Sequence, residues 1–516
     1  MPKIISLVLT PKQASDATIY VPLAAQRAGV SDKNIALARV VKRSIDARSK
    51  NIKVNLSVEL YIDEDVMPDA VHFDYPDVSN KTEVIVIGSG PAGLFAALRL
   101  IEKGYKPIVL ERGNEVSARK RDIAQINRNA EINPNSNYAF GEGGAGTFSD
   151  GKLFTRSKKR GDYNRALRVF HFHGADESIL YDAHPHIGTD KLPTIIKNMR
   201  ESIISSGGKV IFNAKVSEFI IKQGKITGVK CGDDIYQGAA VVLATGHSAK
   251  DIYRSLHSSG VRLEAKNFAM GVRVEHPQAL IDRAQYKMSS RGDYLPAASY
   301  SLVSQVGGRG VYSFCMCPGG FIVPAMTDSS ESVVNGMSPS LRNSYFANSG
   351  IVTEIRESDY AHLIEEFGVL AGLEYQQMYE KAAKLAGGDA QIAPAQRLDD
   401  FVSNRPSRSL PKSSYVPGVV SSKFSDWMPK IINDSLVEGF KLFDRKVRGF
   451  VCSDAQILGV ESRTSSPIRV PRDRDSFMHP EIQGLFPCGE GAGYAGGIIS
   501  AALDGERVAE AVALYL

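Results

Sequence analysis

The fold is decided by the stretch EVIVIGSGPAG, residues 83–93. Its β-branched start predicts a buried strand, and the residues after it have the apolar spacing of a helix. Gly88 permits the tight turn between them, Gly90 lets a pyrophosphate approach the backbone, and Gly93 allows the helix to pack closely on the strand. Because the free N–H groups at a helix start attract phosphate, the stretch predicts the first unit of a dinucleotide-binding α/β fold.

A second strand, predicted at residues 107–110, ends in Glu111 and completes the motif. A carboxylate there can accept hydrogen bonds from ribose hydroxyls, and its charge disfavours a 2′-phosphate. Strand, turn, helix, second strand and acid thus occur in the order of a dinucleotide site. The motif is compatible with both FAD and NAD.

Two further segments extend this site. A glycine-rich loop at residues 140–153 is expected where a long cofactor lies extended, although an ordinary flexible loop is the alternative. The predicted strand at 240–243 ends in Ala-Thr-Gly, where the chain would pass the cofactor; a core strand ending in a turn has the same pattern. We also expect residues 210–217 and 225–231 to pair as strands that place backbone near the adenine.

The C-terminal run at residues 485–502 favours FAD. It predicts a strand, the pair Gly489-Glu490, a glycine-rich turn and a helix that begins near Gly496. The N–H groups of that helix would point at the N1–C2=O edge of a flavin, and its dipole would stabilise the reduced, anionic ring by roughly 0.3–2 kcal/mol. A plain glycine-rich turn is the alternative. Together the four glycine-bearing segments predict FAD.

These segments resemble the two-dinucleotide-binding-domain flavoproteins of the glutathione-reductase type. The resemblance implies that the residues around Gly88 and Glu111 hold ADP and that Thr245 lines the path of the cofactor. It also implies that Glu490, in place of the more usual Asp, meets the ribityl chain, and that residues 496–498 face the isoalloxazine ring.

A narrower resemblance covers nearly the whole chain. The runs at residues 141–153, 182–190, 312–325 and 461–470 are similar to bacterial and plastid proteins described as uncharacterised FAD-dependent dehydrogenases, and the basic segment 42–50 belongs to the same pattern. Because that family has no settled substrate, the resemblance implies a cofactor and leaves the reaction open.

The motifs and the resemblances give one set of candidate cofactor-binding residues. These are Gly88, Gly90, Pro91, Ala92, Gly93, Glu111, Arg112, Gly143, Gly144, Ala145, Gly146, Val216, Thr245, Gly246, Gly489, Glu490, Gly496, Gly497 and Ile498. No catalytic residue is assigned, and no metal ligand is expected.

The chain is expected to fold as an α/β protein with three parts. A small N-terminal β-α-β-β module occupies residues 1–78, with a linker rich in Asp and Pro from 63 to 80. Residues 80–266 and 470–516 form a Rossmann-like FAD-binding domain, into which a mixed α+β substrate domain, residues 267–469, is inserted. The strands expected in the inserted domain are residues 268–275, 298–306, 310–325 and 350–355, and its helices are residues 361–385 and 429–443.

Composition sets limits on partners and location. The 516 residues carry a net charge of +5, which gives no reason to expect nucleic acid or a membrane surface. No apolar run approaches the ~20 residues of a membrane span, and the apolar run at residues 4–9 is too short for a secretory signal. Five cysteines do not suggest a disulfide framework. We therefore expect a cytoplasmic protein that acts on a small molecule.

Several side chains could take part in chemistry. Cys315 and Cys317 face the same side of a predicted strand, where a disulfide between them would be strained; buried thiols, a redox role and metal binding stay open. His184 and His186 could act as acid or base beside a flavin, or be hydrogen-bonded loop residues. Lys152 follows the glycine loop and by analogy lies near flavin N5. The other candidates are His171, His173 and His247.

The predicted activity is that of an FAD-dependent dehydrogenase or reductase that transfers a hydride at flavin N5. A second glycine triad for NAD(P)H is absent after a strand, and no cysteine precedes Cys231, so a pyridine-nucleotide disulfide reductase is disfavoured. NAD(P)H could still bind transiently as the electron donor. A flavin monooxygenase and a non-enzymatic FAD-containing binding protein are the alternatives.

Overall fold

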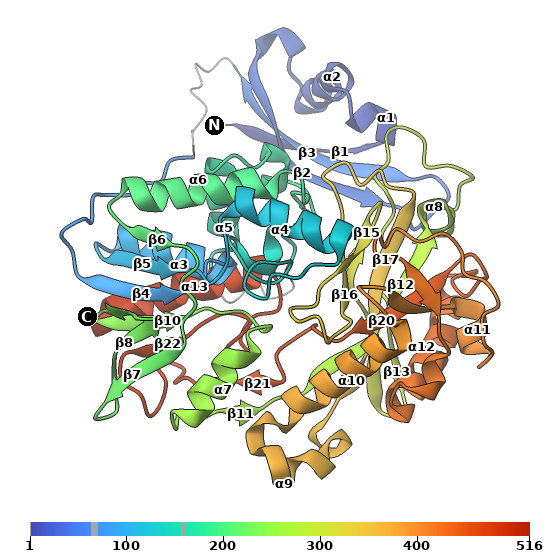
Figure 1. The fold of residues 1–516 in the computed structure, drawn as a ribbon. Helices are drawn as coiled ribbons and strands as arrows, with labels where there is room; N and C mark the ends of the chain where they lie inside the picture. Colours follow the sequence, from blue (N-terminus) through green and yellow to red (C-terminus); the bar gives the residue numbers. More distant parts are fainter. Residues whose placement is uncertain (1, 63–70, 156–160) are drawn as a thin grey trace.

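A five-stranded parallel sheet forms the centre of the predicted FAD-binding domain (Figure 1). The computed structural model describes residues 2–62, 71–155 and 161–516. The strands are β4 (Glu83–Ile87), β5 (Lys106–Leu110), β6 (Lys209–Ile211), β10 (Ala240–Leu243) and β22 (Leu485–Pro487). Their order is β22-β10-β4-β5-β6, so the C-terminal strand joins a sheet built by the first half of the chain. The predicted α/β fold class is confirmed.

Helices cover one face of this sheet, and a small antiparallel sheet covers the other. Val84 and Val86 of β4 pack with the helices, whereas Ile85 and Ile87 pack on the opposite side, so the strand is buried on both faces. The helices are α3 (Pro91–Glu102), α4 (Val116–Asn129), α5 (Tyr163–Phe172), α6 (Leu192–Ser205) and α13 (Ile498–Tyr515). The opposite face carries β7 (Glu218–Lys222), β8 (Lys225–Cys231), β9 (Asp234–Gln237) and α7 (Lys250–Ser258).

The pairing expected between residues 210–217 and 225–231 is wrong. Strand β6 ends at Ile211 and pairs with β5 in the parallel sheet, and β7 is the strand that pairs with β8. Residues 210–217 have the apolar pattern of one strand but contain a turn, because Asn213 adopts a left-handed φ of 55° that ends the strand.

A seven-stranded mixed sheet forms the inserted domain. It consists of β12 (Phe268–Pro277), β13 (Val303–Val306), β14 (Arg309–Cys317), β17 (Phe346–Ile355), β18 (Ala393–Arg397), β19 (Val419–Ser421) and β20 (Gln456–Glu461). The order across the sheet is β13-β14-β17-β12-β20-β18-β19. Two long helices, α10 (Ala371–Gly387) and α12 (Lys430–Lys446), pack against it (Figure 1). Helix α12 confirms the helix predicted at 429–443, whereas the run predicted at 361–385 is broken before α10, where Gly368 takes a left-handed φ of 54°. Shorter helices are α8 (Gln278–Tyr286), α9 (Ile364–Phe367) and α11 (Leu398–Val402).

Two of the strands predicted in this domain are shorter than expected. The run at 298–306 is strand only from Val303 onward, and at its start the carbonyl of Ala298 accepts a hydrogen bond from the side chain of Gln278 at 3.0 Å. The run at 310–325 divides into β14 and β15 (Phe321–Pro324), since Gly319 takes a left-handed φ of 50° between them. Strand β15 then pairs with β16 (Val334–Met337) in a separate two-stranded sheet.

The two connections between the domain of the parallel sheet and the inserted domain lie side by side. Strand β11 (Glu264–Ala265) leads into the inserted domain, β21 (Ile468–Arg469) leads out of it, and the two pair in antiparallel fashion. This pairing ties the entrance and the exit of the inserted domain together.

A buried ionic cluster also joins the two domains. Lys250 Nζ of α7 lies 2.7 Å from Glu331 Oε1 and 2.6 Å from Glu380 Oε2. Arg463 binds the same two carboxylates, at 2.7 Å and 3.1 Å. Because two cations meet two carboxylates away from water, each charge in the cluster is paired.

The N-terminal module is an antiparallel sheet with helices on one side (Figure 1). It consists of β1 (Lys3–Leu9), α1 (Pro11–Ala14), α2 (Ala17–Ala28), β2 (Ile35–Asp46) and β3 (Lys53–Ile62), with the strand order β1-β3-β2. These elements confirm the predicted strands and helix, and Gly29 ends α2 with a φ of 72°. Arg43 of the basic segment pairs with Asp182 at 2.6 Å. Residues 63–70 of the predicted linker lie outside the described residues.

The structure also bears on membrane association. Within the described ranges, no helix combines the length and the apolar character that a membrane span requires.

Candidate cofactor and substrate site

A cavity of about 390 Å³ opens at the carboxyl edge of the parallel sheet, where β4, β5 and β10 end. In doubly wound sheets, ligands bind in the crevice at this edge, and the volume is that of an ordinary small-molecule site. The predicted cofactor residues line the cavity, with the exception of Gly93, Gly143 and Gly489. Segments far apart in the chain are thereby brought together at one site.

Glycine shapes the turn that follows β4. Gly88 has a φ of 98°, and a Cβ there would lie 2.5 Å from the carbonyl oxygen of Ala244. A Cβ on Gly93 would lie 1.9 Å from the carbonyl oxygen of Gly88, so α3 packs directly on the turn. Gly90 is the N-cap of α3 and lines the cavity, so the free N–H groups of the helix border it. The turn has the features of a diphosphate cradle.

The second glycine loop lies against the first. A Cβ on Gly144 would lie 3.1 Å from the Cα of Gly90, so the two loops meet backbone to backbone. Gly143 has a φ of 78° and does not line the cavity. A Cβ on Gly143 would lie 1.9 Å from Thr147 Oγ1. Packing on both sides therefore holds this loop in one conformation.

Glu111 connects the two glycine loops. One carboxylate oxygen accepts hydrogen bonds from the N–H and the Oγ of Ser89, at 3.0 and 2.7 Å. The other accepts the N–H groups of Gly113 and Gly141, each at 3.0 Å. Since these bonds fill the four acceptor positions of a carboxylate, a ribose hydroxyl would have to replace one of them. The ribose contact stays a prediction. The structure adds a second role for Glu111, which holds the two glycine loops together.

Arg112 and Phe140 form one end of the cavity. The guanidinium carbon of Arg112 lies 4.0 Å from the centre of the Phe140 ring, and its Nη1 donates to Asp251 Oδ1 at 3.0 Å. Val216 lines this end too, next to Lys215, which pairs with Asp251 at 3.0 Å. The end predicted to hold adenine is thus walled by side chains that bind one another.

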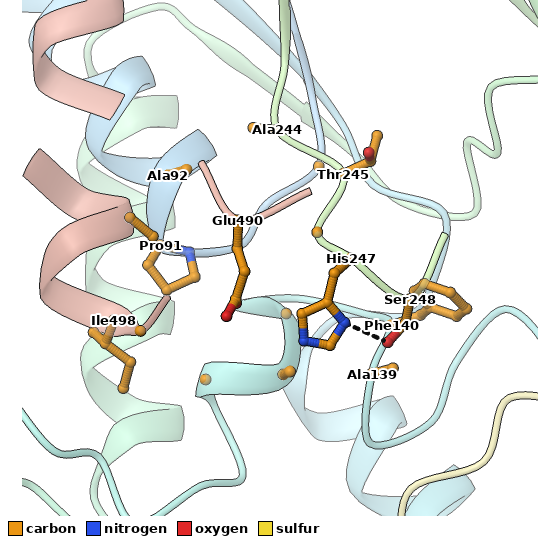
Figure 2. Close-up of a pocket in the computed structure, with 18 of the residues that line it drawn as sticks. Pro91, Ala92, Ala139, Phe140, Ala244, Thr245, His247, Ser248, Glu490 and Ile498 are labelled. Carbon is orange, nitrogen blue, oxygen red and sulfur yellow. Dashed lines mark hydrogen bonds between the residues drawn. The ribbon is translucent and has the colours of Figure 1, made fainter. Parts of the chain in front are cut away.

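Glu490 and His247 lie further along the cavity. Figure 2 shows Glu490 between Pro91 and His247, with its carboxylate directed into the open space. Burial raises the pKa of Glu490 to about 7, and the charge of Lys266 opposes this rise. Burial, assisted by the charge of Arg463, lowers the pKa of His247 to about 4. At neutral pH His247 is therefore uncharged, and Glu490 is the group that can hold or release a proton.

The start of α13 borders the same space. The helix begins at Ile498 with Gly497 as its N-cap, and a Cβ on Gly496 or Gly497 would meet no atom within 4 Å. Gly489 lies behind the cavity, where its N–H donates to Asp504 Oδ2 at 2.7 Å. The cavity therefore meets a second helix N-terminus, in addition to that of α3.

The inserted domain supplies the opposite wall. Phe314, Cys315, Asn335 and Arg463 line the cavity there, close to Lys152 of the glycine loop. Lys152 and Cys315 were candidates from the sequence. Asn335 and Arg463 were not, because only tertiary packing brings them to the FAD segments.

The two histidine pairs singled out in the sequence do not line the cavity. His186 Nε2 donates to the carbonyl of Ser340 at 3.0 Å, and His173 Nδ1 donates to the carbonyl of Val169 at 2.7 Å. Burial lowers the pKa of both imidazoles. Among the described residues, the cavity lining includes neither histidine pair, whereas it includes His247.

Three family descriptions match parts of the chain. Residues 82–280 match the family described as pyridine nucleotide-disulphide oxidoreductase. Residues 267–464 match the family described as FAD-dependent protein, C-terminal domain-like, and residues 1–61 match a domain of unknown function. Together with the glycine cradle, these matches define the class of the chain as an FAD-dependent oxidoreductase.

A full-length relative defines the family more closely. An uncharacterised protein of Clostridium beijerinckii is 40% identical over 506 residues, which cover 94% of each chain. The chain belongs to the same family as this protein, a family of uncharacterised FAD-dependent oxidoreductases.

More distant relatives match only part of the chain. Protein FixC of Escherichia coli O157:H7 is 24% identical over 204 residues, which cover 39% of this chain and 45% of FixC. A probable electron transfer flavoprotein-quinone oxidoreductase of Escherichia coli is 25% identical over 32% of this chain and 37% of its own length. A geranylgeranyl bacteriochlorophyll reductase-like protein of Thermoplasma acidophilum overlaps 84% of this chain and 78% of its own, at 13% identity and a TM-score of 0.38. Both the identity and the TM-score are too low to support any inference.

Proposed function

We propose that the protein is a dehydrogenase or reductase that uses FAD to oxidise or reduce a small molecule. One observation carries the proposal: a single cavity runs from the diphosphate cradle at Gly90 to the wall formed by the inserted domain at Arg463. Bound FAD would supply two-electron chemistry through hydride transfer at N5 of its flavin ring. The inserted domain would then provide the surface that the substrate meets.

The proposed roles of individual residues follow from their positions. Gly90 at the start of α3 and the facing turn Gly144–Gly146 would bind the diphosphate with backbone N–H groups. Arg112 and Val216 would hold the adenosine end. Gly497, at the start of α13, would face the flavin ring, where the positive end of the helix dipole favours negative charge.

Glu490 is proposed to hold a proton beside the cofactor. Its pKa of about 7 lets it be protonated or ionised at neutral pH, depending on what binds next to it. The uncharged ring of His247 can donate or accept a hydrogen bond there without adding charge. A protonated Glu490 would also avoid placing a negative charge next to a reduced, anionic flavin.

NAD(P)H is the proposed electron donor, and the cytoplasm is the proposed location. No second glycine triad follows a strand, so a nicotinamide would bind transiently from solution rather than at a site of its own. The relative described as a probable electron transfer flavoprotein-quinone oxidoreductase suggests reduced flavoproteins as the second class of donor to examine.

The experiment that tests the function is anaerobic reduction of the FAD-bound protein. NADH, NADPH and a reduced electron-transfer flavoprotein are mixed with it separately, and the loss of flavin absorbance is followed. Reduction by one of them, followed by reoxidation with a small-molecule acceptor, is the expected result. Bound FAD that no physiological donor reduces would contradict the proposal and favour a binding protein. NAD(P)H-dependent oxygen consumption would instead indicate a monooxygenase.

A further inference from the structure

Cys315 and Cys317 lie on β14 at the cavity wall, where the strand bulges. Phe314 pairs with Gly350 and Cys317 pairs with Asn348, so β14 holds one residue more than β17 between these pairs. Cys315 takes a left-handed φ of 45°, which is unfavourable for a residue other than glycine. Bulges re-aim side chains, and here Cys315 lines the cavity while Cys317 is buried behind it. The prediction that a disulfide between them is strained assumed a regular strand, and the bulge removes that assumption.

Two cations lie close to the buried sulfur of Cys317. Lys152 Nζ lies 4.0 Å from Cys317 Sγ, and Arg273 Nη2 lies 3.8 Å from the same atom. Arg273 Nη2 also donates to the carbonyl of Cys315 at 2.7 Å, while Glu461 binds its Nη1 at 2.8 Å. Lys152 lines the cavity and Arg273 is fully buried, so one cation lies on each side of Cys317 Sγ. Such an environment favours a thiolate.

The side chains of Cys315 and Cys317 shift each other's pKa in opposite directions. A hydrogen bond between their side chains is the main reason why the pKa of Cys315 is lowered and that of Cys317 is raised. The charges of Lys152 and Arg273 lower the pKa of Cys315 further, against its burial and the charge of Asp150. The lowered pKa favours ionisation of Cys315, on the cavity side, while the thiol of Cys317 donates to the carbonyl of Cys315 at 3.2 Å behind it. A thiolate next to a second thiol is the starting arrangement for thiol–disulfide chemistry.

The other cysteines provide a contrast. Burial raises the pKa of Cys231, Cys452 and Cys488, as expected for inert thiols. In the parts of the chain that the structure describes, Cys315 is the cysteine that lines the cavity. The features of a reactive thiol are thus confined to one pair.

We propose that Cys315 and Cys317 form a redox-active dithiol that exchanges two electrons with the flavin, an inference that rests on the proposed function. When the sulfur–sulfur bond forms, the thiolate and the thiol together give up two electrons and the proton of Cys317. The oxidised flavin accepts both electrons and the proton, and the reverse step returns them, so atoms and charge balance. Because Cys315 faces the cavity, a small thiol or disulfide is the class of substrate that this pair would serve.

The test is a stoichiometric reduction of the FAD-bound protein without oxygen. The holoprotein is oxidised with ferricyanide, desalted and titrated with dithionite, while flavin absorbance is recorded and free thiols are alkylated and located by mass spectrometry. We expect four electrons per FAD, two for the flavin and two for a disulfide. The alkylation should show Cys315 and Cys317 blocked in the oxidised protein and free in the reduced one.

Two variants serve as controls. Cys317→Ala should take up two electrons per FAD, whereas Cys452→Ala, which removes a thiol outside the cavity, should take up four. Bound FAD that takes up two electrons in the wild-type protein, with both thiols free after oxidation, would overturn the inference and leave the proposed function intact. A chain that binds no FAD would instead refute the proposed function. If Cys317→Ala does not fold, the wild-type electron count and thiol map decide alone.

Discussion

Gly144→Ala tests whether the close approach of the two glycine loops builds the FAD site. Gly144 has a φ of 60°, and the new Cβ would lie 3.1 Å from the Cα of Gly90. A left-handed alanine costs about 1–2 kcal/mol, and the backbone contact must also be relieved by moving the loops apart. If about 1–3 kcal/mol of this cost appears in cofactor binding, the Kd for FAD rises roughly 5- to 150-fold.

The matched control for this change is Gly388→Ala. Gly388 also has a left-handed φ, 85°, but a Cβ there would meet no atom within 4 Å, and the residue lies at the end of α10. Both variants should lose thermal stability as apoproteins, and Gly144→Ala alone should bind FAD more weakly when titrated by flavin fluorescence. Wild-type FAD affinity in Gly144→Ala would refute the idea that the contact between the loops shapes the site.

Three further changes test other parts of the structure. Lys250→Met leaves Arg463 as the one cation for two buried carboxylates, so one negative charge is uncompensated and the free energy of unfolding in denaturant should fall by ~3–5 kcal/mol. The control, Lys430→Ala at an exposed pair, should change it little, and equal losses would contradict this account. Glu490 has a folded pKa of about 7 against an ordinary value of 4.5, so the folded chain binds more protons between these values. Wild-type apoprotein should therefore lose stability relative to Glu490→Gln as the pH rises from 4.5 to 7, and parallel stability curves would argue against it. Lys152→Met should slow the alkylation of Cys315 by iodoacetamide, since the ammonium lowers the pKa of that thiol, by up to about tenfold for each unit by which the pKa rises above the pH of the assay. An unchanged rate would show that Lys152 does not act on the thiol.

The parts of the site that sequence reasoning located are those that depend on neighbours in the chain. The turn at Gly88 and Gly90 needs a strand before it and a helix after it, and both can be read from a few consecutive residues. The start of α13 at Ile498 follows from a glycine-rich turn before an apolar helix for the same reason. Short-range geometry sets these features, so the motif and the structure agree.

Features that depend on distant contacts could not be predicted in this way. Arg463 reaches the cavity because its side chain is held by Glu331 and Glu380, far away in the sequence. The acceptor positions of Glu111 are filled by the hydroxyl of Ser89 and by backbone N–H groups of two loops, so a residue expected to bind ribose also holds these loops together. The bulge that turns Cys315 toward the cavity could not be predicted either, because the sequence around it has the pattern of a regular strand.

Binding of FAD is the central claim, and the flavin content of the purified protein tests it most directly. The chain is incubated with excess FAD, passed through a gel-filtration column, and examined for flavin absorbance in the protein peak. We predict that about one FAD per chain elutes with the protein, as expected for one cavity with one diphosphate cradle. A protein peak without flavin absorbance after this treatment would contradict the account.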